Sequence, residues 1–245
     1  MKLALGAMNL PAIARAERAP ERARDIAVRM HEVNAGYQRT RVLDGVDLEI
    51  REGEFLGVVG RSGSGKSTLL KLLYGALAPL SGTLVVAGLT LRRNSTTHVM
   101  RLRRRVGCVF QSYELLPGLS ALENVVFPLK LAHPGVRDPY AYARDALELV
   151  GLAHKHARLP AELSGGEQQR LAIARAVAHE PRILLADEPT GNLDRATAQS
   201  VAEVFRLLHK AGGTIVLASH DEDLVASDAQ RVVRVEEGAL QVERR

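Results

Sequence analysis

The chain has 245 residues, of which 46% are hydrophobic and 25% charged, a composition typical of a soluble globular protein. This length can bury the core of one large domain, or of a domain with a subdomain. The formal net charge of +5 suggests a nucleic-acid or membrane-surface partner, but aromatic residues make up only 4% of the chain and Trp is absent. Because few side chains can stack on single strands, we expect no nucleic-acid partner.

The cysteine content and the apolar runs bear on the compartment. Cys108 is the single cysteine, so no internal disulfide can form, as in proteins of a reducing cytoplasm. No uncharged apolar run reaches the ~18 to 20 residues that a membrane-spanning helix needs. The stretch from Leu3 to Ala14 is faintly similar to a signal peptide, but Asn9 and Pro11 interrupt it. We therefore expect a cytoplasmic protein.

The first predicted elements are strands. Residues 1–25 end in the charged, proline-broken run ARAERAPERAR, which has too little apolar surface to pack, so we predict a flexible extension there. The folded part, residues 26–245, is predicted to begin with a strand at 26–33. Apolar and acidic residues alternate around 46–50, which predicts a second, half-buried strand, and a third begins at Phe55.

A glycine-rich turn and an apolar-periodic helix follow the third strand, and the turn matches G-x-x-x-x-G-K-[ST]. Glycine takes positive φ freely, so the backbone N–H groups can wrap phosphates. Lys66 is expected to reach the β- and γ-phosphates of ATP, and the Ser67 hydroxyl to bind Mg²⁺. The alternative is an ordinary glycine-rich turn before a helix. The predicted nucleotide-binding residues are Gly60, Arg61, Ser62, Gly63, Ser64, Gly65, Lys66, Ser67 and Thr68.

The pattern becomes helical from about residue 112 to 165. Ser120 begins a capping box, and Asp138 with Pro139 is a second helix start. Pro128 is expected to disturb the first of these helices. We therefore predict a helical subdomain inserted into an α/β core.

The core resumes after this insertion. A helix is predicted to begin at Ser164 and to end before Pro181. Strands that alternate with helices predict a mainly parallel sheet. The other elements predicted beyond the phosphate loop are strands at 82–87, 105–110, 183–186, 214–219, 232–235 and 239–242, and a helix at 196–210.

Two adjacent acids follow the apolar strand at 183–186. Asp187 ends a buried run, where an isolated carboxylate is costly unless it meets a cation, so we assign it to Mg²⁺ through water. Glu188 is the predicted general base that activates the attacking water. Without a phosphate loop, the pair would be two acids at an ordinary strand end.

Taken together, these motifs resemble the ATPase subunits of ABC transporters over roughly residues 26–245. The resemblance implies a P-loop NTPase core of the ABC ATPase type, with a mainly parallel sheet, flanking helices, an N-terminal antiparallel β subdomain and an inserted helical subdomain. It also implies an ATP hydrolase that uses Mg²⁺. The motifs that carry it, in chain order, are the phosphate loop, Gln111, LSGGE at 163–167, Asp187-Glu188, Asn192-Leu193-Asp194 and His220.

In this family LSGGE binds the γ-phosphate of ATP held by the opposite subunit, so the resemblance implies a homodimer in the ATP-bound state. The hydroxyl of Ser164 and the amides of Gly165 and Gly166 lie at the positive end of the following helix, which suits that contact. Glu167 completes the motif.

The resemblance assigns four further residues. Tyr37 is similar to the aromatic residue that stacks on adenine, and otherwise it is a strand-end tyrosine. Gln111 is similar to the residue that contacts Mg²⁺ and the attacking water and connects to the membrane partner. His220 is similar to the switch that hydrogen-bonds the γ-phosphate. Asp194 is similar to the acid that links the two sites across the dimer.

Other stretches narrow the resemblance to the cluster that contains the cell-division ATPase FtsE, the lipoprotein-release ATPase LolD and the macrolide-export ATPase MacB. DEPTGNLD and LLKLLYG are two of these stretches. Members of this cluster often drive extracytoplasmic work through a separate membrane permease, so the resemblance implies a peripheral protein on the cytoplasmic side of the inner membrane. In this family the permease-binding groove lies between the core and the helical subdomain, which here means about residues 111–131. We expect Leu115, Leu116 and Leu119 to be exposed apolar positions of that groove.

The alternative is a soluble ABC ATPase that acts on nucleic acid or the ribosome. DNA-acting relatives carry long coiled coils between the phosphate loop and the LSGGE signature. Here Ser164 of the signature follows Lys66 of the loop by only 98 positions, and this stretch has no sustained heptads. Ribosome-acting relatives fuse two cassettes, and this chain has one. A simple P-loop kinase would leave LSGGE unexplained.

Overall fold

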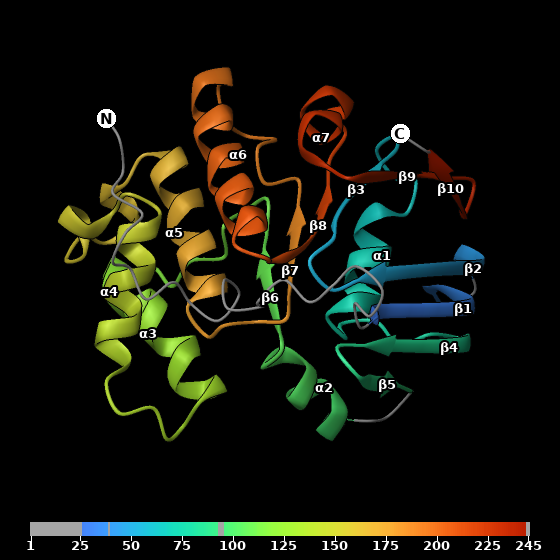
Figure 1. The fold of residues 1–245 in the computed structure, drawn as a ribbon, viewed down its shortest axis with the longest axis horizontal. Coiled ribbons are helices and arrows are strands. Elements are labelled where there is room, and N and C mark those ends of the chain that lie inside the picture. Colours follow the sequence, from blue (N-terminus) through green and yellow to red (C-terminus); the bar gives the residue numbers. More distant parts are fainter. Residues whose placement is uncertain (1–25, 39, 93–95, 244–245) are drawn as a thin grey trace.

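The computed structural model describes residues 26–38, 40–92 and 96–243. The predicted extension at residues 1–25 lies outside the described residues. Figure 1 shows a central sheet with helices on one side and a second sheet on the other.

The central sheet has six strands in the order β10-β9-β3-β8-β7-β6. Its strands from β9 to β6 are parallel to their neighbours, and β10 is antiparallel to β9. The mainly parallel α/β core predicted from the sequence is therefore confirmed. The strand bounds are β3 Phe55–Val59, β6 Val106–Val109, β7 Ile183–Asp187, β8 Thr214–Ala218, β9 Arg231–Glu236 and β10 Ala239–Glu243.

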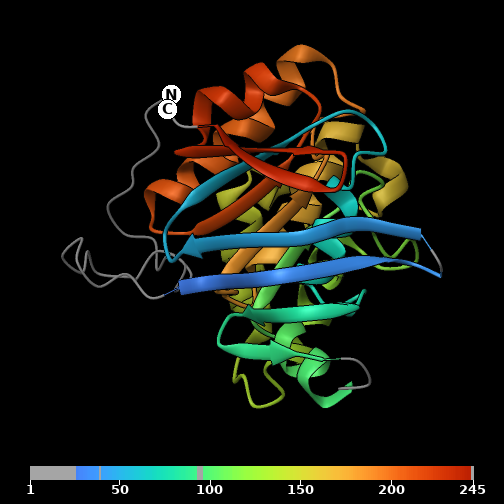
Figure 2. The ribbon, with the colours of Figure 1, turned by 90° about the vertical axis from the view of Figure 1, so that its right-hand side faces the viewer.

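A second, antiparallel sheet of four strands has the order β2-β1-β4-β5. The turned view of Figure 2 shows the long strands β1 and β2 crossing the molecule side by side. The predicted strands at 26–33 and 46–50 are parts of these longer strands. The bounds are β1 Ile26–Tyr37, β2 Thr40–Arg51, β4 Ser81–Val86 and β5 Leu89–Leu91.

Helix α1 contacts strands of both sheets, namely β1, β2, β7 and β8, so it lies between them. Helices α3, α4 and α5 pack on one another, and α5 also contacts β6 and α6 (Figure 1). The helix bounds are α1 Lys66–Leu73, α2 Thr96–Arg103, α3 Ala121–Ala132, α4 Pro139–Leu149, α5 Gly165–Val177, α6 Arg195–Lys210 and α7 Glu222–Asp228, with 3-10 turns at Ala153–Lys155 and Pro160–Glu162.

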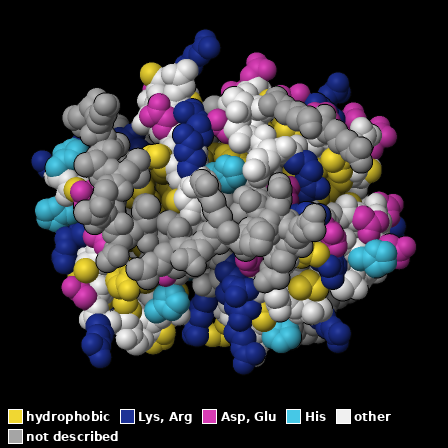
Figure 3. All heavy atoms as spheres, in the orientation of Figure 1, with side chains coloured by type: hydrophobic (Ala, Val, Ile, Leu, Met, Phe, Trp, Pro, Cys, Tyr) yellow, Lys and Arg dark blue, Asp and Glu magenta, His cyan; other side chains and the backbone are white. Residues whose placement is uncertain are grey.

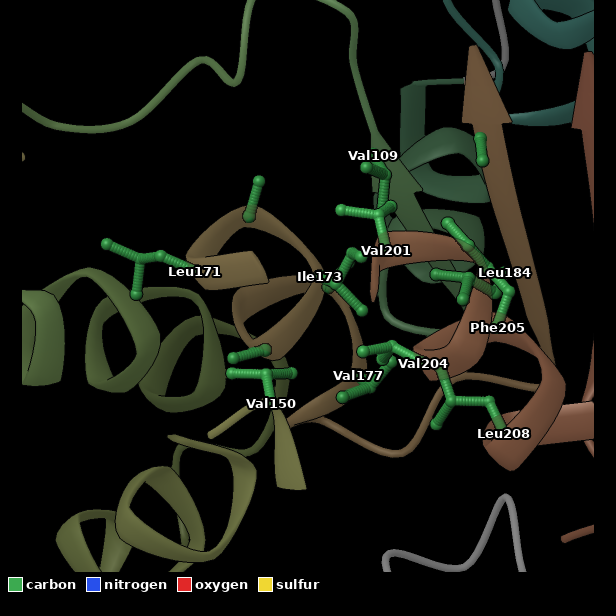
Figure 4. Packing of buried hydrophobic residues seen from close by; sticks show 14 of the residues in the cluster. Val109, Val150, Leu171, Ile173, Val177, Leu184, Val201, Val204, Phe205 and Leu208 are labelled. Atoms are coloured by element: carbon green, nitrogen blue, oxygen red, sulfur yellow. The ribbon is translucent and has the colours of Figure 1, made fainter. Parts of the chain in front are cut away.

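The period-two alternation of the central strands divides the core into two clusters. Leu184 and Ala186 of β7 face α5 and α6, whereas Ile183 and Leu185 face α1 and the second sheet. Figure 4 shows the first cluster, in which α5 and α6 pack together and Phe205 lies beside Leu184. With both faces of the sheet covered, the carboxyl ends of its strands are fixed in place.

Several local predictions were incomplete. The structure adds β5, α2 and α7, which were not predicted because each is short; α2 buries only Leu102. Pro128 lies inside α3, but the helix continues to Ala132, and α5 ends at Val177. Within the described part of the chain, no helix combines the length and apolar character needed to cross a bilayer.

Candidate active site

The glycine-rich turn joins the carboxyl end of β3 to the first residue of α1. Gly60 has φ 147°, and a Cβ there would lie 2.6 Å from the Val235 carbonyl oxygen. Gly65 has φ 118° and precedes α1, whose first residue is Lys66. Side chains are therefore excluded from the inner surface of the turn, and backbone N–H groups at the positive end of α1 are available to an anion.

Lys66 is buried beneath this turn. Its Nζ donates to the carbonyl oxygens of Gly60 at 2.8 Å and Arg61 at 3.4 Å. The same nitrogen lies 3.4 Å from Oε1 of Glu188, with both side chains largely buried. A buried ammonium needs an anionic partner, and here it lies where the turn would hold phosphates.

A cavity of about 580 Å³ opens at the turn and brings together residues from both sheets. Tyr37, at the end of β1, lines it, with 43% of its surface exposed and with Nζ of Lys71 5.5 Å from its ring centroid. Gly60, Arg61 and Ser64 belong to the adjoining hollow beside Arg234. The cavity is lined by Tyr37, Val42, Ser62, Gly63, Gly65, Lys66, Ser67, Thr68, Gln111, Glu188 and His220.

Oxygen ligands for a hard cation meet beside the cavity. The Ser67 hydroxyl donates to Oδ1 of Asp187 at 3.2 Å. Burial raises the pKa of the Asp187 carboxyl, and the nearby Glu188 charge raises it further, so a cation there would offset an unfavourable charge. Among the described residues no cluster of three or more His, Cys, Asp or Glu side chains could hold a metal. A hydroxyl and one carboxylate are oxygen donors of the kind that Mg²⁺ takes beside waters and substrate phosphate oxygens.

Glu188 is held by donors from three directions. Its φ is 47°, an unusual value for a residue other than glycine. Its Oε2 accepts from the Ser219 hydroxyl and the His220 amide, each at 3.2 Å, and lies 2.8 Å from Nδ1 of His220. With Lys66 on Oε1, the carboxylate is fixed at the edge of the cavity.

Gln111 lies just beyond the end of β6 and is exposed. Its side chain donates to Oδ1 of Asn192 at 3.4 Å, and Asn192 donates back to its carbonyl oxygen at 3.4 Å. After Gln111, Tyr113 and Glu114 both have positive φ, and Arg175 of α5 donates to their carbonyl oxygens. The Gln111 segment is thereby joined to α5.

The LSGGE residues are at the start of α5 and are not among those lining the cavity. Ser164 is the exposed N-cap, its hydroxyl accepting from the Glu167 amide at 3.4 Å. Gly166 is buried: a Cβ there would lie 2.1 Å from Cγ2 of Thr197, so glycine lets α5 approach α6. Asp194 caps α6, its carboxylate accepting from Ala196 and Thr197.

Leu115, Leu116 and Leu119, which were expected to be exposed, are all half-buried. Leu115 packs against the core, and the turn at Leu116 and Leu119 is fixed by Asn124, a fully buried side chain. Its amide donates to the carbonyl oxygens of Leu116 and Leu119, and it accepts from the Leu116 amide. The expectation of exposed leucines was wrong, because a buried amide draws this turn onto α3.

Comparisons with known proteins agree with this geometry. The family model described as ABC transporter matches residues 43–191. The chain is 43% identical to the cell division ATP-binding protein FtsE of Mycobacterium tuberculosis, with 81% of this chain and 86% of that protein covered. It is 45% identical to the lipoprotein-releasing system ATP-binding protein LolD of Legionella pneumophila, covering 84% and 91%.

A solved structure, the dimeric post-hydrolysis state of the ATP-binding cassette MJ0796 bound to ADP and phosphate, superposes with a TM-score of 0.81. It is 34% identical and covers 89% of this chain and 98% of that one. The chain belongs to the ABC transporter ATP-binding family. It is an ABC ATPase that binds and hydrolyses ATP, and the predicted ABC-type fold is confirmed.

Some residues at the site of this ABC ATPase were given no part by sequence reasoning. Ser219 bonds both Glu188 and the Asp221 amide, Asn192 pairs with Gln111, and Lys155 contacts Glu167. Asn192 belongs to the recognised Asn192-Leu193-Asp194 motif and Ser219 adjoins His220, but neither position indicated these contacts. No sequence pattern pointed to Lys155, because only the folded structure brings it to α5.

Proposed function

We propose that this ABC ATPase binds MgATP in the cavity at the phosphate loop, closes as a homodimer on two nucleotides and drives a separate membrane permease. One observation carries the proposal: Lys66, Glu188 and His220, from three separate segments, converge on the same cavity. Convergence of a cation, a carboxylate and an imidazole on a phosphate-binding turn fits phosphoryl transfer to water.

The nucleotide is assigned to the loop and to β1. The loop amides from Gly60 to Thr68 and the Lys66 ammonium would hold the phosphates, and the exposed ring of Tyr37 would stack on adenine. Ser67, Asp187 and Gln111 would hold Mg²⁺, which would supply positive charge to offset that of the phosphates.

Glu188 is assigned as the general base. Its carboxylate lines the cavity and is oriented by Ser219 and His220, so it can accept the proton of a water that attacks the γ-phosphate. In the free chain Lys66 shares this carboxylate, and a phosphate would compete for the ammonium. His220 holds Glu188 through Nδ1, and its Nε2, when it also carries a proton, would donate to the γ-phosphate.

Ser164 and Gly165 are assigned to the partner's ATP, because they are at the start of α5 and not in this chain's cavity. Glu167 supports them from within the chain, since its carboxylate is bonded to Ser164 and Lys155. Asp194, at the start of α6, is assigned to coupling between the two sites.

The permease is assigned to a groove of about 390 Å³ between α2 and the end of α3. Met100 and Leu131 line it with 65% and 61% of their surfaces exposed, and Phe127 lies next to it on α3 with 49% exposed. Arg103 and Arg104 form its basic rim. Figure 3 shows Lys and Arg side chains gathered at the lower edge of the molecule, where α2 lies in Figure 1.

With a permease bound at this groove, the protein would lie at the cytoplasmic face of the inner membrane. The identities to FtsE and LolD support a role in cell-division signalling, lipoprotein release or export. The domain limits, with a helical subdomain at about 112–165 that holds α3 and α4, belong to the same proposal.

A mixed dimer tests the two-site arrangement. Lys66→Ala disables the chain's own site, and Ser164→Arg disables its partner's, so a heterodimer of the two variants has both lesions in one site and keeps the other intact. Its Mg²⁺-dependent ATPase, measured after tandem-tag isolation, should exceed that of either mutant homodimer. Full activity in the Ser164→Arg homodimer would overturn the role of the signature.

A further inference from the structure

We infer that Lys155 is a positioning residue that fixes Ser164 through Glu167 and ties the signature to α3. The inference rests on the proposed role of Ser164 toward the partner's ATP. Lys155 would not touch nucleotide; it would set the position of the residue that does.

Both oxygens of the Glu167 carboxylate are engaged. Oε1 lies 2.5 Å from Nζ of Lys155, and Oε2 accepts from the Ser164 amide at 3.0 Å. The Ser164 hydroxyl in turn accepts from the Glu167 amide. Such a reciprocal capping box fixes the backbone at the start of a helix, and Lys155 holds the carboxylate that closes it.

The pair is sheltered from solvent. The side chains of Lys155 and Glu167 are 29% and 18% exposed, so water and salt screen this contact less than a surface ion pair. The Lys155 hydrogen bond is the main reason that the pKa of Glu167 falls to about 2, with the Ser164 amide second. The carboxylate is therefore charged throughout the physiological pH range.

The segment that carries Lys155 is bonded to α3. The first amides of α3, those of Ala121 and Leu122, donate to the carbonyl oxygens of Arg158 and His156 at 2.7 and 2.9 Å. These are orphan donors of a helix start, so their satisfaction fixes the segment against the helix. Since the other end of α3 lines the groove assigned to the permease, Lys155 connects that helix to the signature.

A neighbouring pair supplies a matched control. Arg158 lies 2.8 Å from Oε1 of Glu162, whose Oε2 accepts from the Leu159 amide at 2.8 Å. The ion pair and the amide bond repeat those of Lys155, Glu167 and Ser164, but Leu159 has no hydroxyl to return the bond. Both charged side chains are also more exposed, at 61% and 43%, and Glu162 belongs to a 3-10 turn. Arg158→Met therefore removes a similar ion pair that bonds neither Ser164 nor Glu167.

Lys155→Met should lower kcat for ATP and weaken ATP-induced dimerisation, each on the order of tenfold, because a charged hydrogen bond to a sheltered carboxylate is lost. ATP binding to the monomer, measured by fluorescent-nucleotide titration in a Glu188→Gln background, should not change, since the cavity at Lys66 is untouched. Lys155→Arg should restore most of kcat, and Arg158→Met should leave both readouts near the parent value.

A double-mutant cycle decides whether Lys155 acts through Glu167. In a Glu167→Gln background, Lys155→Met should have little further effect on dimerisation, because the charge that it holds is gone. Equal effects in both backgrounds, or equal effects of Lys155→Met and Arg158→Met, would overturn the inference. The Ser164→Arg homodimer separates the two claims: if it is inactive while Lys155→Met is normal, the inference fails and the signature proposal stands.

Discussion

Oε2 of Glu188 lies 2.8 Å from Nδ1 of His220, and the same oxygen accepts from the Ser219 hydroxyl and the His220 amide. Three donors on Oε2 fix the carboxylate. The other oxygen, Oε1, lies near Lys66 beside the cavity. A base held in this way needs little reorganisation when water attacks.

Glu188→Gln should therefore keep nucleotide binding and stop turnover. The amide preserves the shape of the side chain but cannot accept the proton, which should lower kcat by ~10² to 10⁴. The variant should accumulate as an ATP-bound dimer, visible by size-exclusion chromatography with light scattering. Hydrolysis near the parent rate would show that Glu188 is not the base.

Ser219→Ala should lower kcat with little change in KM. The hydroxyl donates to Glu188 and accepts from the Asp221 amide, so its loss frees the base without touching the phosphate loop. A hydrogen bond to a charged group is worth ~1.5–3 kcal/mol, which corresponds to about tenfold or more in rate. Steady-state kinetics are the measurement, and Ser219→Thr, which keeps the hydroxyl, is the control.

Asp187→Asn should stabilise the nucleotide-free chain while it abolishes Mg²⁺-dependent hydrolysis. Because the folded pKa of Asp187 lies above its unfolded value of 3.8, its contribution to stability is present below that value and is lost as pH rises through the folded pKa. At pH 7 the charged carboxylate therefore lowers stability. The amide removes that charge, and the Tm should rise by roughly 1–3 °C in scanning fluorimetry.

Asp194→Asn is the control of opposite sign. The Thr197 hydrogen bonds hold the pKa of Asp194 below its usual range, so this carboxylate contributes stability above its unfolded pKa that is lost as pH falls through the folded pKa. Replacing this carboxylate with an amide should lower the Tm at pH 7. The fall should be slight, because Asn also caps helices. A fall in Tm for Asp187→Asn would contradict the argument.

Contiguous motifs made part of this site predictable from the sequence. In the loop from Gly60 to Lys66, glycines allow the backbone conformation and the lysine supplies the charge. The two acids at the end of β7 could be predicted because Asp187 ends a buried apolar strand. The parallel core followed from the alternation of strands and helices. Each of these signals lies within a few residues of chain.

Contacts between distant segments could not be predicted in this way. Gly166 was expected to expose an amide, yet it also lets α5 pack on Thr197. Asn124 bonds the backbone of Leu116 and Leu119, in a turn that the sequence pattern left exposed. Lys155 reaches Glu167 only once α3 and α5 have packed. Such roles depend on tertiary distances that apolar periodicity does not encode.

The last prediction concerns the groove between α2 and α3. Phe127→Glu and Leu131→Glu place a charge on exposed apolar positions of α3, so they should release a permease helix and leave the nucleotide cavity intact. Val242→Glu on β10, which is 52% exposed and belongs to the edge of the central sheet opposite β6, is the matched control. The measurement is affinity purification of each variant in a Glu188→Gln background from detergent-solubilised cells with ATP present. A multi-span protein should copurify with the parent and the Val242 variant and be lost from the α3 variants. Recovery of DNA or ribosomal proteins alone would favour a soluble ABC ATPase.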